Sequence, residues 1–527
     1  MPRLPRRAVL PALLIAAAAA FPGTVAASPT QQSIIQDDAQ LMANPVRTLA
    51  TFRELGVSRV RVTVAWSSLA PGAHAGSPPR RFDAGDPAAY PAGNWTPYDN
   101  VVRYAAVYHI GVNFMLTGPA PQWAEGAGEP RGGLFGVWWP SASAFGAFVH
   151  AVGERYSGSY RPSRGAAPLP RVSSWSIWNE PNYGYDLAPQ TNASGTVVNA
   201  AREYRGLLAA AWGGLRATGH STRRDTILIG ETAPRGSVGA PGNFGGTKPL
   251  IFLRALYCVD GGYRQLRGSA AAAIGCPTTT AGSRRFRAQN AALFAASGFA
   301  DHPYTFQGHP VAPNVTTNSY GPGPSDPNYA DLPVVGRLEG VLDRLGAIYG
   351  SRTRYAIWNT EYGYRTRPPD PHAGVSQATA AYWMNWAEYL SWRQSRIASF
   401  MQYLLVDPPN GLFATGLELP SGAHKAGFDA FRMPLYLPFT AERRGTRLEV
   451  WGDVRPAHFA PGAQRVAIQF QAASRGAWRT LSTVALGNAE GYFDTRVRFP
   501  SSGAVRLAWT DPAGQPLYSR TQAIAVR

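Results

Sequence analysis

The sequence predicts an α/β protein, a (β/α)8 TIM barrel followed by a small all-β immunoglobulin-like sandwich. Three observations support this fold class. Eight short apolar, β-prone segments alternate with helix-like segments between residues 31 and 406, which is the order of a closed parallel barrel. These segments are nearly continuous apolar runs, as strands buried on both faces are. From residue 439 onward, short segments of alternating polarity are separated by Gly, Pro and Asn, without helical periodicity.

The elements of the predicted barrel follow one another in a regular order. The first strand is predicted at 34–38, and the helix at 44–55 could be capped by Asn44, with Pro45 at its first position. The other strands are predicted at 57–66, 112–117, 172–180, 226–231, 298–304, 354–361 and 397–406. The other helices are predicted at 98–108, 141–156, 198–218, 249–257, 335–349 and 376–394.

The length also favours two domains, because 527 residues exceed what one hydrophobic core usually serves. The terminal domain is expected to contain strands at 448–451, 465–470, 478–484, 492–499 and 505–509. We therefore divide the chain into a barrel domain at 28–438 and a sandwich domain at 439–527.

Residues 1–27 are typical of a secretory signal peptide. Three arginines precede a short apolar run at 8–21, and the small residues Ala26 and Ala27 supply a cleavage site. No later segment is apolar enough to span a bilayer, so we expect a secreted, extracellular protein with no membrane span after cleavage. In an exported protein, Cys258 and Cys276 are expected to form one disulfide, although two unpaired thiols are the alternative.

The net charge of +18 raises the question of nucleic-acid binding. Only Lys248 and Lys425 are lysines, and the many arginines are scattered among Ala, Gly and Pro rather than gathered in a basic stripe. This pattern is typical of coding bias, and we expect no nucleic-acid partner. Weak attraction to an acidic cell surface is the remaining interpretation of the charge.

Two predicted strands end in similar sequences that each present a glutamate. The fourth ends in Trp178-Asn179-Glu180-Pro181, and the seventh in Trp358-Asn359-Thr360-Glu361. Chemistry in a (β/α)8 barrel takes place at the carboxyl ends of the strands. Two carboxyl groups from different strands are what glycoside hydrolysis requires. The alternative is that both glutamates belong to buried structural ion pairs.

These two motifs resemble the fourth- and seventh-strand signatures of glycoside hydrolase clan A, nearest to the family 5 and family 39 retaining glycosidases of bacteria. The resemblance covers most of residues 31–438 and does not extend to the last domain. It implies that Glu180 is the general acid/base and Glu361 the nucleophile. It also implies that Arg61 hydrogen-bonds the nucleophile and that Asn179 binds the 2-hydroxyl of the sugar.

The resemblance extends to the predicted sixth strand. The His302-Pro-Tyr304 motif of that strand implies a histidine beside the acid/base and a tyrosine hydroxyl that orients the nucleophile. On the eighth strand, Gln402 and Tyr403 stand where the clan often carries a tryptophan platform, so this chain departs from the clan there.

Other candidate substrate-binding residues come from residue type and position alone. Glu231 ends the fifth strand and could bind substrate hydroxyls or form a salt bridge with a loop arginine such as Arg235. Tryptophans at or near strand ends could stack on the apolar faces of sugar rings, although ordinary packing is the alternative for each. These candidates are Trp66, Trp123 and Trp358.

The function predicted from these residues is that of an exported retaining glycoside hydrolase acting on a polysaccharide or oligosaccharide. A double displacement with a glutamate nucleophile requires no metal and no cofactor. The alternatives are a transglycosylase that remodels cell walls and a carbohydrate-binding barrel without activity. The terminal domain is expected to act as a brace or in association with the cell surface.

Overall fold

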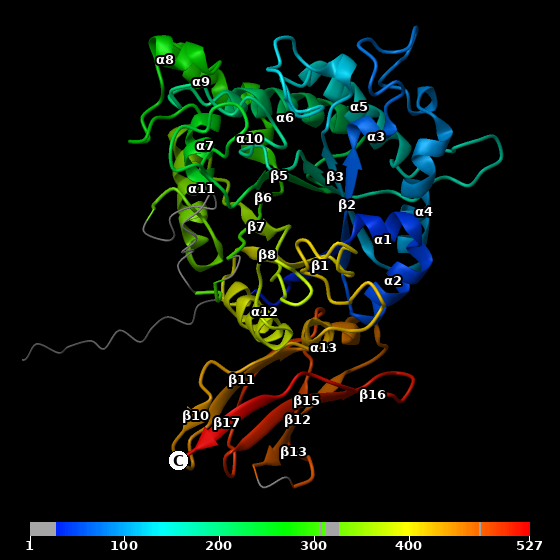
Figure 1. The fold of residues 1–527 in the computed structure, drawn as a ribbon, viewed down its shortest axis with the longest axis vertical. Coiled ribbons are helices and arrows are strands. Elements are labelled where there is room, and N and C mark those ends of the chain that lie inside the picture. The colour runs from blue at the N-terminus through cyan, green and yellow to red at the C-terminus, as the bar shows by residue number, and fades with distance from the viewer. Residues whose placement is uncertain (1–27, 306–307, 312–325, 474–475) are drawn as a thin grey trace, which may run out of the picture.

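The computed structural model describes residues 28–305, 308–311, 326–473 and 476–527. The predicted signal peptide at 1–27 lies outside these residues. The described chain forms a closed barrel of eight parallel strands in sequential order, β1 to β8, surrounded by helices (Figure 1). A β domain follows at the lower end of the view. The predicted fold class is confirmed.

The barrel strands are short and buried. Their bounds are β1 Gln32–Gln36, β2 Arg59–Ala65, β3 Gly111–Thr117, β4 Ser174–Ile177, β5 Thr226–Thr232, β6 Gly298–Asp301, β7 Ala356–Asn359 and β8 Ile397–Tyr403. The pairing of β1 with β8 closes the barrel. The first strand begins and ends two residues earlier than predicted. It ends there because Asp37 accepts a hydrogen bond from the Gln40 N–H and caps a helix that the sequence analysis did not predict.

Helices cover the outside of the barrel. They are α1 Asp38–Ala43, α2 Pro45–Glu54, α3 Trp66–Leu69, α4 Ala92–Tyr108, α5 Ala142–Arg155, α6 Asn199–Ala217, α7 Pro249–Leu256, α8 Gly268–Ala273, α9 Thr280–Gln289, α10 Ala292–Ala295, α11 Gly336–Ile348, α12 Gln377–Trp392 and α13 Ala426–Arg432. Short 3-10 turns lie at Pro87–Ala89, Gln122–Ala124 and Leu332–Val334. The cap predicted for α2 is present, since the Asn44 side chain accepts from the Arg47 N–H and Pro45 opens the helix.

The cysteine loop contains the predicted disulfide between Cys258 and Cys276, with 5.6 Å between the Cα atoms. It links the end of α7 to the segment between α8 and α9. Among the described residues, no helix combines the length and the apolar character that crossing a bilayer requires.

The β domain consists of two facing sheets. One contains β10 Ala441–Glu442, β17 Gln522–Val526, β15 Gly503–Thr510, β12 Arg465–Ala472 and β13 Arg479–Ala485, with β16 Pro516–Tyr518 paired to β15. The other contains β14 Tyr492–Val497, β11 Leu448–Asp453 and β9 Leu435–Tyr436. Apolar side chains of both sheets, such as Val450 and Leu507, share one buried core. Because β9 precedes residue 439, this sheet begins earlier than the predicted domain boundary.

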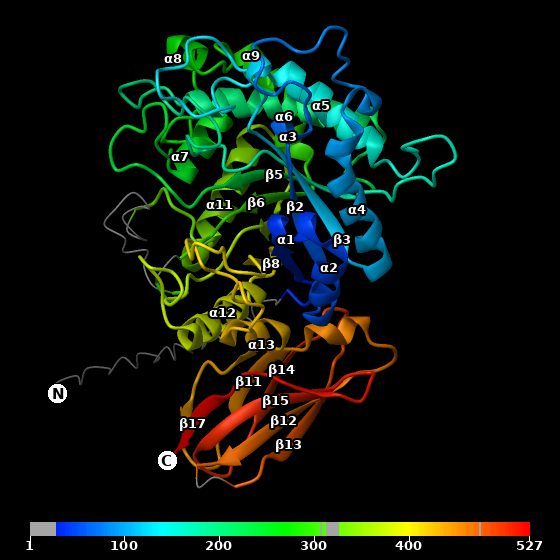
Figure 2. The same ribbon diagram turned by 45° about the vertical axis from the view of Figure 1, so that its right-hand side comes forward.

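A buried charge pair joins the β domain to the barrel. Arg455, in the 3-10 turn Arg455–Phe459, forms an ion pair with Glu388 of α12, and both side chains are almost fully buried. Tyr492 donates a 2.9 Å hydrogen bond to the same carboxylate. The Trp451 ring packs on the Tyr389 ring at 5.6 Å. Figures 1 and 2 show α12 and α13 between the barrel and the sheets.

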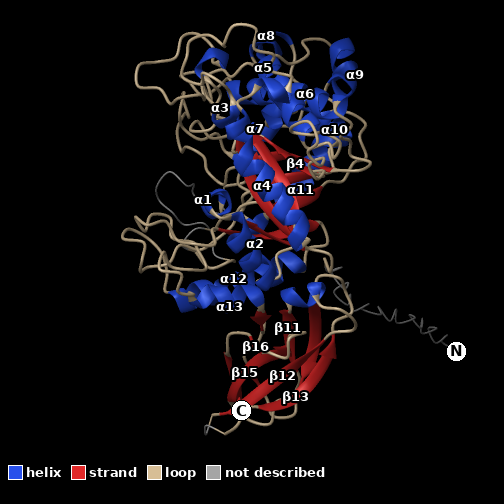
Figure 3. Cartoon of the chain, turned by 90° about the vertical axis from the view of Figure 1, so that its right-hand side faces the viewer, coloured by secondary structure: helices blue, strands red, loops and turns tan. Residues whose placement is uncertain are grey.

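The β domain also contacts the amino ends of the first two barrel strands. Gln31, just before β1, donates to the Tyr492 hydroxyl at 3.2 Å, and Ser58, just before β2, donates to Glu490 at 2.7 Å. The red strands of this domain lie at the foot of the molecule in Figure 3. This attachment leaves the carboxyl ends of the barrel strands, where the candidate site lies, free of the β domain.

Candidate active site

The two predicted catalytic glutamates line one cavity at the carboxyl ends of the barrel strands. Glu180 follows β4 and Glu361 follows β7. The cavity has a volume of about 370 Å³, which is within the range of small-molecule sites. Its lining comes from the segments after several strands and consists of Asn179, Glu180, Pro234, Arg235, Tyr304, Glu361, Tyr403, Leu404, Pro408 and Phe413.

The carboxyl groups of Glu180 and Glu361 lie close together. One oxygen of each, with a ring nitrogen of His302, forms a group whose atoms all lie within 4.8 Å of one another. The backbone at these strand ends is strained, because Trp178, Glu180 and Glu231 have φ values of 65°, 36° and 49°. Left-handed conformations of non-glycine residues cost on the order of 1–3 kcal/mol and cluster at functional sites.

Arg61 on β2 lies at the centre of the polar network beneath the cavity. Its side chain is fully buried and donates to Glu361 Oε1 at 2.8 Å, to Asn179 Oδ1 at 3.0 Å and to Glu231 Oε2 at 3.0 Å. A further hydrogen bond reaches the side chain of Gln36 on β1. The predicted contact between Arg61 and Glu361 is therefore present, and the guanidinium also orients Asn179 beside the acid/base candidate.

His302 connects the two glutamates with a third carboxylate. Its Nδ1 lies 2.9 Å from Glu180 Oε1 and 3.6 Å from Glu361 Oε2, and its Nε2 lies 2.9 Å from Glu231 Oε2. Burial alone would lower the pKa of His302, but the charge of Glu361 and the hydrogen bonds to Glu180 and Glu231 raise it to about 10. At neutral pH, His302 is thus an imidazolium that donates to a carboxylate at each nitrogen.

The ionisation of Glu180 depends on this histidine. Burial raises the pKa of Glu180, but the hydrogen bond from His302 and its positive charge outweigh that effect, and the pKa lies below the ordinary value for a glutamate. The proton that His302 and Glu180 share therefore resides mainly on His302.

Glu231 is a structural anion and does not contact the cavity. Its side chain is fully buried and accepts hydrogen bonds from Arg61, His302 and Thr360, the last at 2.7 Å. Burial raises the pKa of Glu231, but Arg61 and His302 lower it to about 2. A salt bridge is therefore present, but its partner is Arg61 on β2 and not the loop arginine Arg235 that the sequence suggested. Glu231 fixes the arginine that binds Glu361 and the histidine that binds Glu180.

Two features of the cavity were not predicted from the sequence. Asp186 accepts a 3.0 Å hydrogen bond from Asn179 Nδ2, and burial together with the charge of Glu180 raises its pKa well above the ordinary value. Arg235 lines the cavity beyond the end of β5. Neither residue belongs to a recognisable motif, and only their positions a few residues after β4 and β5 could have indicated them.

Tyr304 occupies its expected position, with its hydroxyl 3.4 Å from Glu361 Oε2. It forms part of the cavity wall with Tyr403 and Phe413, whose rings pack edge to face at 5.8 Å. A sugar ring can stack on such aromatic surfaces while its hydroxyl groups reach the polar side of the cavity.

Four other candidates, Trp66, Trp123, Trp358 and Gln402, are not among the residues that line the cavity. Trp66 is fully buried among Trp123, Phe145 and Phe148, and Trp123 is packed against the same core. Trp358 points into the barrel interior with apolar residues of β1, β5, β6 and β8. Gln402 is buried and donates to the carbonyl groups of Tyr403 and Thr415, so it shapes the loop after β8. Indole size and strand-end position did not distinguish packing from binding.

Glu180, His302 and Glu361 also have the residue types of a metal site within the described part of the chain. A metal would require the lone pair of a histidine nitrogen. Both nitrogens of His302, however, lie 2.9 Å from carboxylate oxygens, and its raised pKa of about 10 keeps both protonated. This donor set fits a site that stores a proton better than one that binds a cation.

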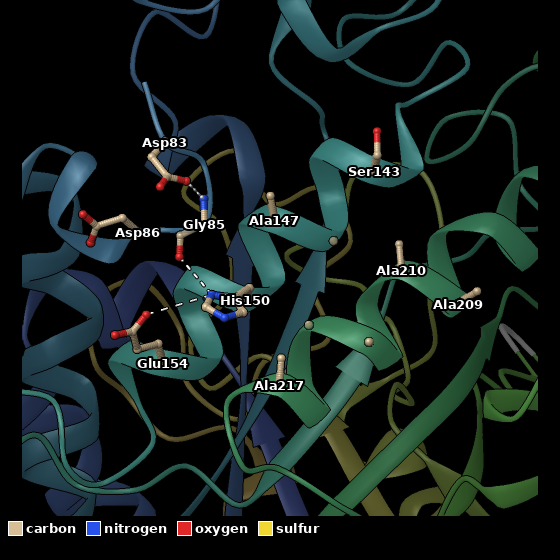
Figure 4. Close-up of a pocket in the computed structure, with 13 residues that line it drawn as sticks. Asp83, Gly85, Asp86, Ser143, Ala147, His150, Glu154, Ala209, Ala210 and Ala217 are labelled. Carbon is tan, nitrogen blue, oxygen red and sulfur yellow. Dashed lines mark hydrogen bonds and ion pairs between the residues drawn. The ribbon is translucent and has the colours of Figure 1, made fainter. Parts of the chain in front are cut away.

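A larger cavity of about 840 Å³ lies between α5 and α6 (Figure 4). Small residues of the two helices line it, and His150 bonds the Gly85 carbonyl at 2.9 Å beside Glu154. This cavity does not include the buried charge network beneath Glu180 and Glu361, and we assign it no function.

The charge network makes a prediction about stability. The pKa of His302 is about 10 in the folded protein and about 6.5 in an unfolded chain. Its protonation therefore stabilises the fold fully below pH 6.5, and that contribution is lost as the pH rises toward 10. The difference in unfolding free energy between the wild type and His302→Asn is expected to shrink over this range. Urea denaturation at several pH values measures it, and a pH-independent difference would contradict the assignment.

No protein-family model and no curated protein matches the sequence. Solved structures do resemble the chain. A family 39 glycoside hydrolase from the gut symbiont Bacteroides cellulosilyticus WH2 is 13% identical, with 95% of this chain and 81% of that chain covered and a TM-score of 0.48. An endo-β-1,4-mannanase from Thermotoga petrophila is 11% identical, with 95% and 98% covered and a TM-score of 0.40. A family 1 β-glucosidase from Thermotoga maritima is 13% identical, with 72% and 81% covered and a TM-score of 0.41.

Proposed function

We propose that this protein is a retaining glycoside hydrolase that cleaves O-glycosidic bonds in a polysaccharide or oligosaccharide. The observation that carries the proposal is the pair of glutamates in one cavity, with carboxylate oxygens within 4.8 Å of each other. Retaining enzymes hold their two carboxyl groups about 5–5.5 Å apart, whereas inverting enzymes need about 6.5–9.5 Å to admit a water molecule.

In the first step, Glu180 donates a proton to the glycosidic oxygen while Glu361 attacks the anomeric carbon. The bond to the leaving group breaks, and a glycosyl ester forms on Glu361. Arg61 and Tyr304 aim the Glu361 carboxylate through their hydrogen bonds. The 2.9 Å contact between His302 and Glu180 supplies a route by which the stored proton reaches Glu180.

In the second step, Glu180 removes a proton from water, and the resulting hydroxide attacks the anomeric carbon and breaks the ester. Asn179 is placed to bind the 2-hydroxyl, because Arg61 and Asp186 hold its amide at the cavity wall. Contacts of this kind strengthen as charge develops at the anomeric carbon. No cofactor takes part in either step of this proposal.

We also propose that the protein is exported. The basic and apolar segment at 1–27 and the Cys258–Cys276 disulfide support this, because disulfides persist in oxidising compartments. The barrel at 28–438 then carries the chemistry. The β domain acts as a brace, since the Arg455–Glu388 pair fixes it to α12. Association of that domain with the cell surface is compatible with the same arrangement.

A panel of aryl glycosides, pyranosidic and furanosidic, tests the proposed function. We expect at least one member to be hydrolysed, and we expect the double variant Glu180→Gln/Glu361→Gln to lose that activity while keeping the far-UV spectrum of the wild type. Product analysis at high acceptor concentration identifies a transglycosylase. Binding of glycans without turnover of any member would instead indicate a carbohydrate-binding barrel.

A further inference from the structure

Arg235 places a positive charge on the same side of the cavity as the acid/base candidate. It lies three residues after the end of β5, and with Asn179 and Glu180 it lines the part of the cavity that the segments after β4 and β5 form. In a closed barrel of eight sequential strands, β4 and β8 lie across from each other. The segment after β8, with Tyr403 and Phe413, therefore forms the opposite wall.

The position of Arg235 is supported by two tyrosines. Its guanidinium carbon lies 4.8 Å from the centre of the Tyr183 ring, which is the geometry of a cation–π contact. The Tyr183 ring stacks on Tyr185 with 5.0 Å between centroids and 17° between planes. Tyr185 is 59% exposed. The stacked rings connect the charged wall of the cavity to an exposed aromatic surface.

The reaction chemistry assigns this wall to the leaving group. In a double displacement, the nucleophile and the acid act on opposite faces of the anomeric carbon, and the acid protonates the departing oxygen. Groups on the Glu180 side therefore face the sugar or aglycone that departs. An arginine binds a carboxylate or sulfate through charge-assisted hydrogen bonds, and an aromatic ring stacks on a sugar face.

We propose, resting on the proposed function, that Arg235 forms a binding subsite for an anionic substituent on the leaving group. The substrate is then an acidic glycan that carries carboxylate or sulfate groups. Tyr185 offers the stacking surface for that part of the substrate.

Arg235 also has a consequence for catalysis. Its positive charge helps to keep Glu180 ionised, whereas the first step needs Glu180 in the protonated form. An anion bound to Arg235 offsets that charge. A matching anionic substrate therefore weakens the effect by which Arg235 favours the ionised form of Glu180.

The experiment uses two substrates whose leaving groups differ in charge. They are the 4-carboxy-2-nitrophenyl glycoside of whichever sugar the enzyme accepts and the methyl ester of the same compound. We expect the wild type to show a kcat/KM about tenfold higher for the carboxylate than for the ester, because one charge-assisted hydrogen bond contributes about that factor. Arg235→Gln is expected to abolish this preference, so that the ratio of the kcat/KM values for the two substrates falls by about tenfold.

Two further variants serve as controls. Arg223→Gln removes one exposed arginine from the segment before β5, so it lowers the net charge equally without touching the cavity. It should keep the preference of the wild type, and Arg235→Lys should keep part of it. Equal kcat/KM values for both substrates in the wild type, or a preference that survives in Arg235→Gln, would overturn the subsite. Failure of the wild type to hydrolyse either glycoside would instead count against the proposed function.

Discussion

Replacing Glu361 with glycine is expected to lower kcat by at least about four orders of magnitude, because no other group can form the covalent intermediate. Added azide fits the space that the missing carboxylate leaves and attacks the anomeric carbon from the same side. Turnover is then restored, and the product is a glycosyl azide with the anomeric configuration opposite to that of the substrate. Mass spectrometry and NMR of the product measure this outcome.

Glu129→Gly is a suitable comparison, because Glu129 is an exposed glutamate in the loop after β3 and does not line the cavity. It should retain the activity of the wild type without azide. If Glu361→Gly kept normal turnover without azide, Glu361 would not be the nucleophile.

Replacing Glu180 with glutamine is expected to affect substrates according to their leaving groups. General acid catalysis contributes about 10²–10⁴-fold, so poor leaving groups should lose about that factor. A 2,4-dinitrophenyl leaving group departs without protonation, and the first step should proceed. The second step then lacks its base, and a burst of dinitrophenol should precede slow turnover in stopped-flow measurements.

Azide separates this variant from the first one. With Glu180→Gln it should give a glycosyl azide that keeps the configuration of the substrate, because azide replaces water at the glycosyl ester. An equal loss of activity for good and poor leaving groups would contradict the role of Glu180 as acid and base.

The proximity of the candidate catalytic residues could be predicted from the sequence because strand order determines where strand ends meet. Glu180, Glu361 and His302 each follow an apolar, β-prone segment, and a closed parallel barrel brings all such ends to one face. Arg61 was placed with them only by the resemblance to clan A, and its full burial on β2 requires a charged partner. The structure supplies that partner in Glu231 and Glu361.

The remainder of the site depends on loop conformation, which local sequence does not determine. Trp66 and Trp358 have the residue type of a sugar platform but point into apolar cores. Asp186 and Arg235 line or adjoin the cavity through turns whose path follows from long-range packing. The bulge in the pairing of β5 with β6, between Gly230 and Thr232, turns Glu231 inward toward Arg61, and no sequence period predicts it.

The buried charges explain how one cavity can hold two carboxylates. Arg61 and His302 contribute two positive charges beside the carboxylates of Glu180, Glu231 and Glu361, and burial together with the charge of Glu180 raises the pKa of Asp186. The proton that His302 carries on Nδ1 faces Glu180, which is the group that donates a proton in the proposed first step. The arrangement thus separates the roles of two glutamates whose sequence motifs are similar.

The central claim is that the carboxyl groups of Glu180 and Glu361 are too close for a water molecule to act between them. Proton NMR of a hydrolysed substrate, recorded before mutarotation, tests this claim most directly. The account predicts that the first sugar released has the anomeric configuration of the substrate. Release of the opposite anomer would contradict it.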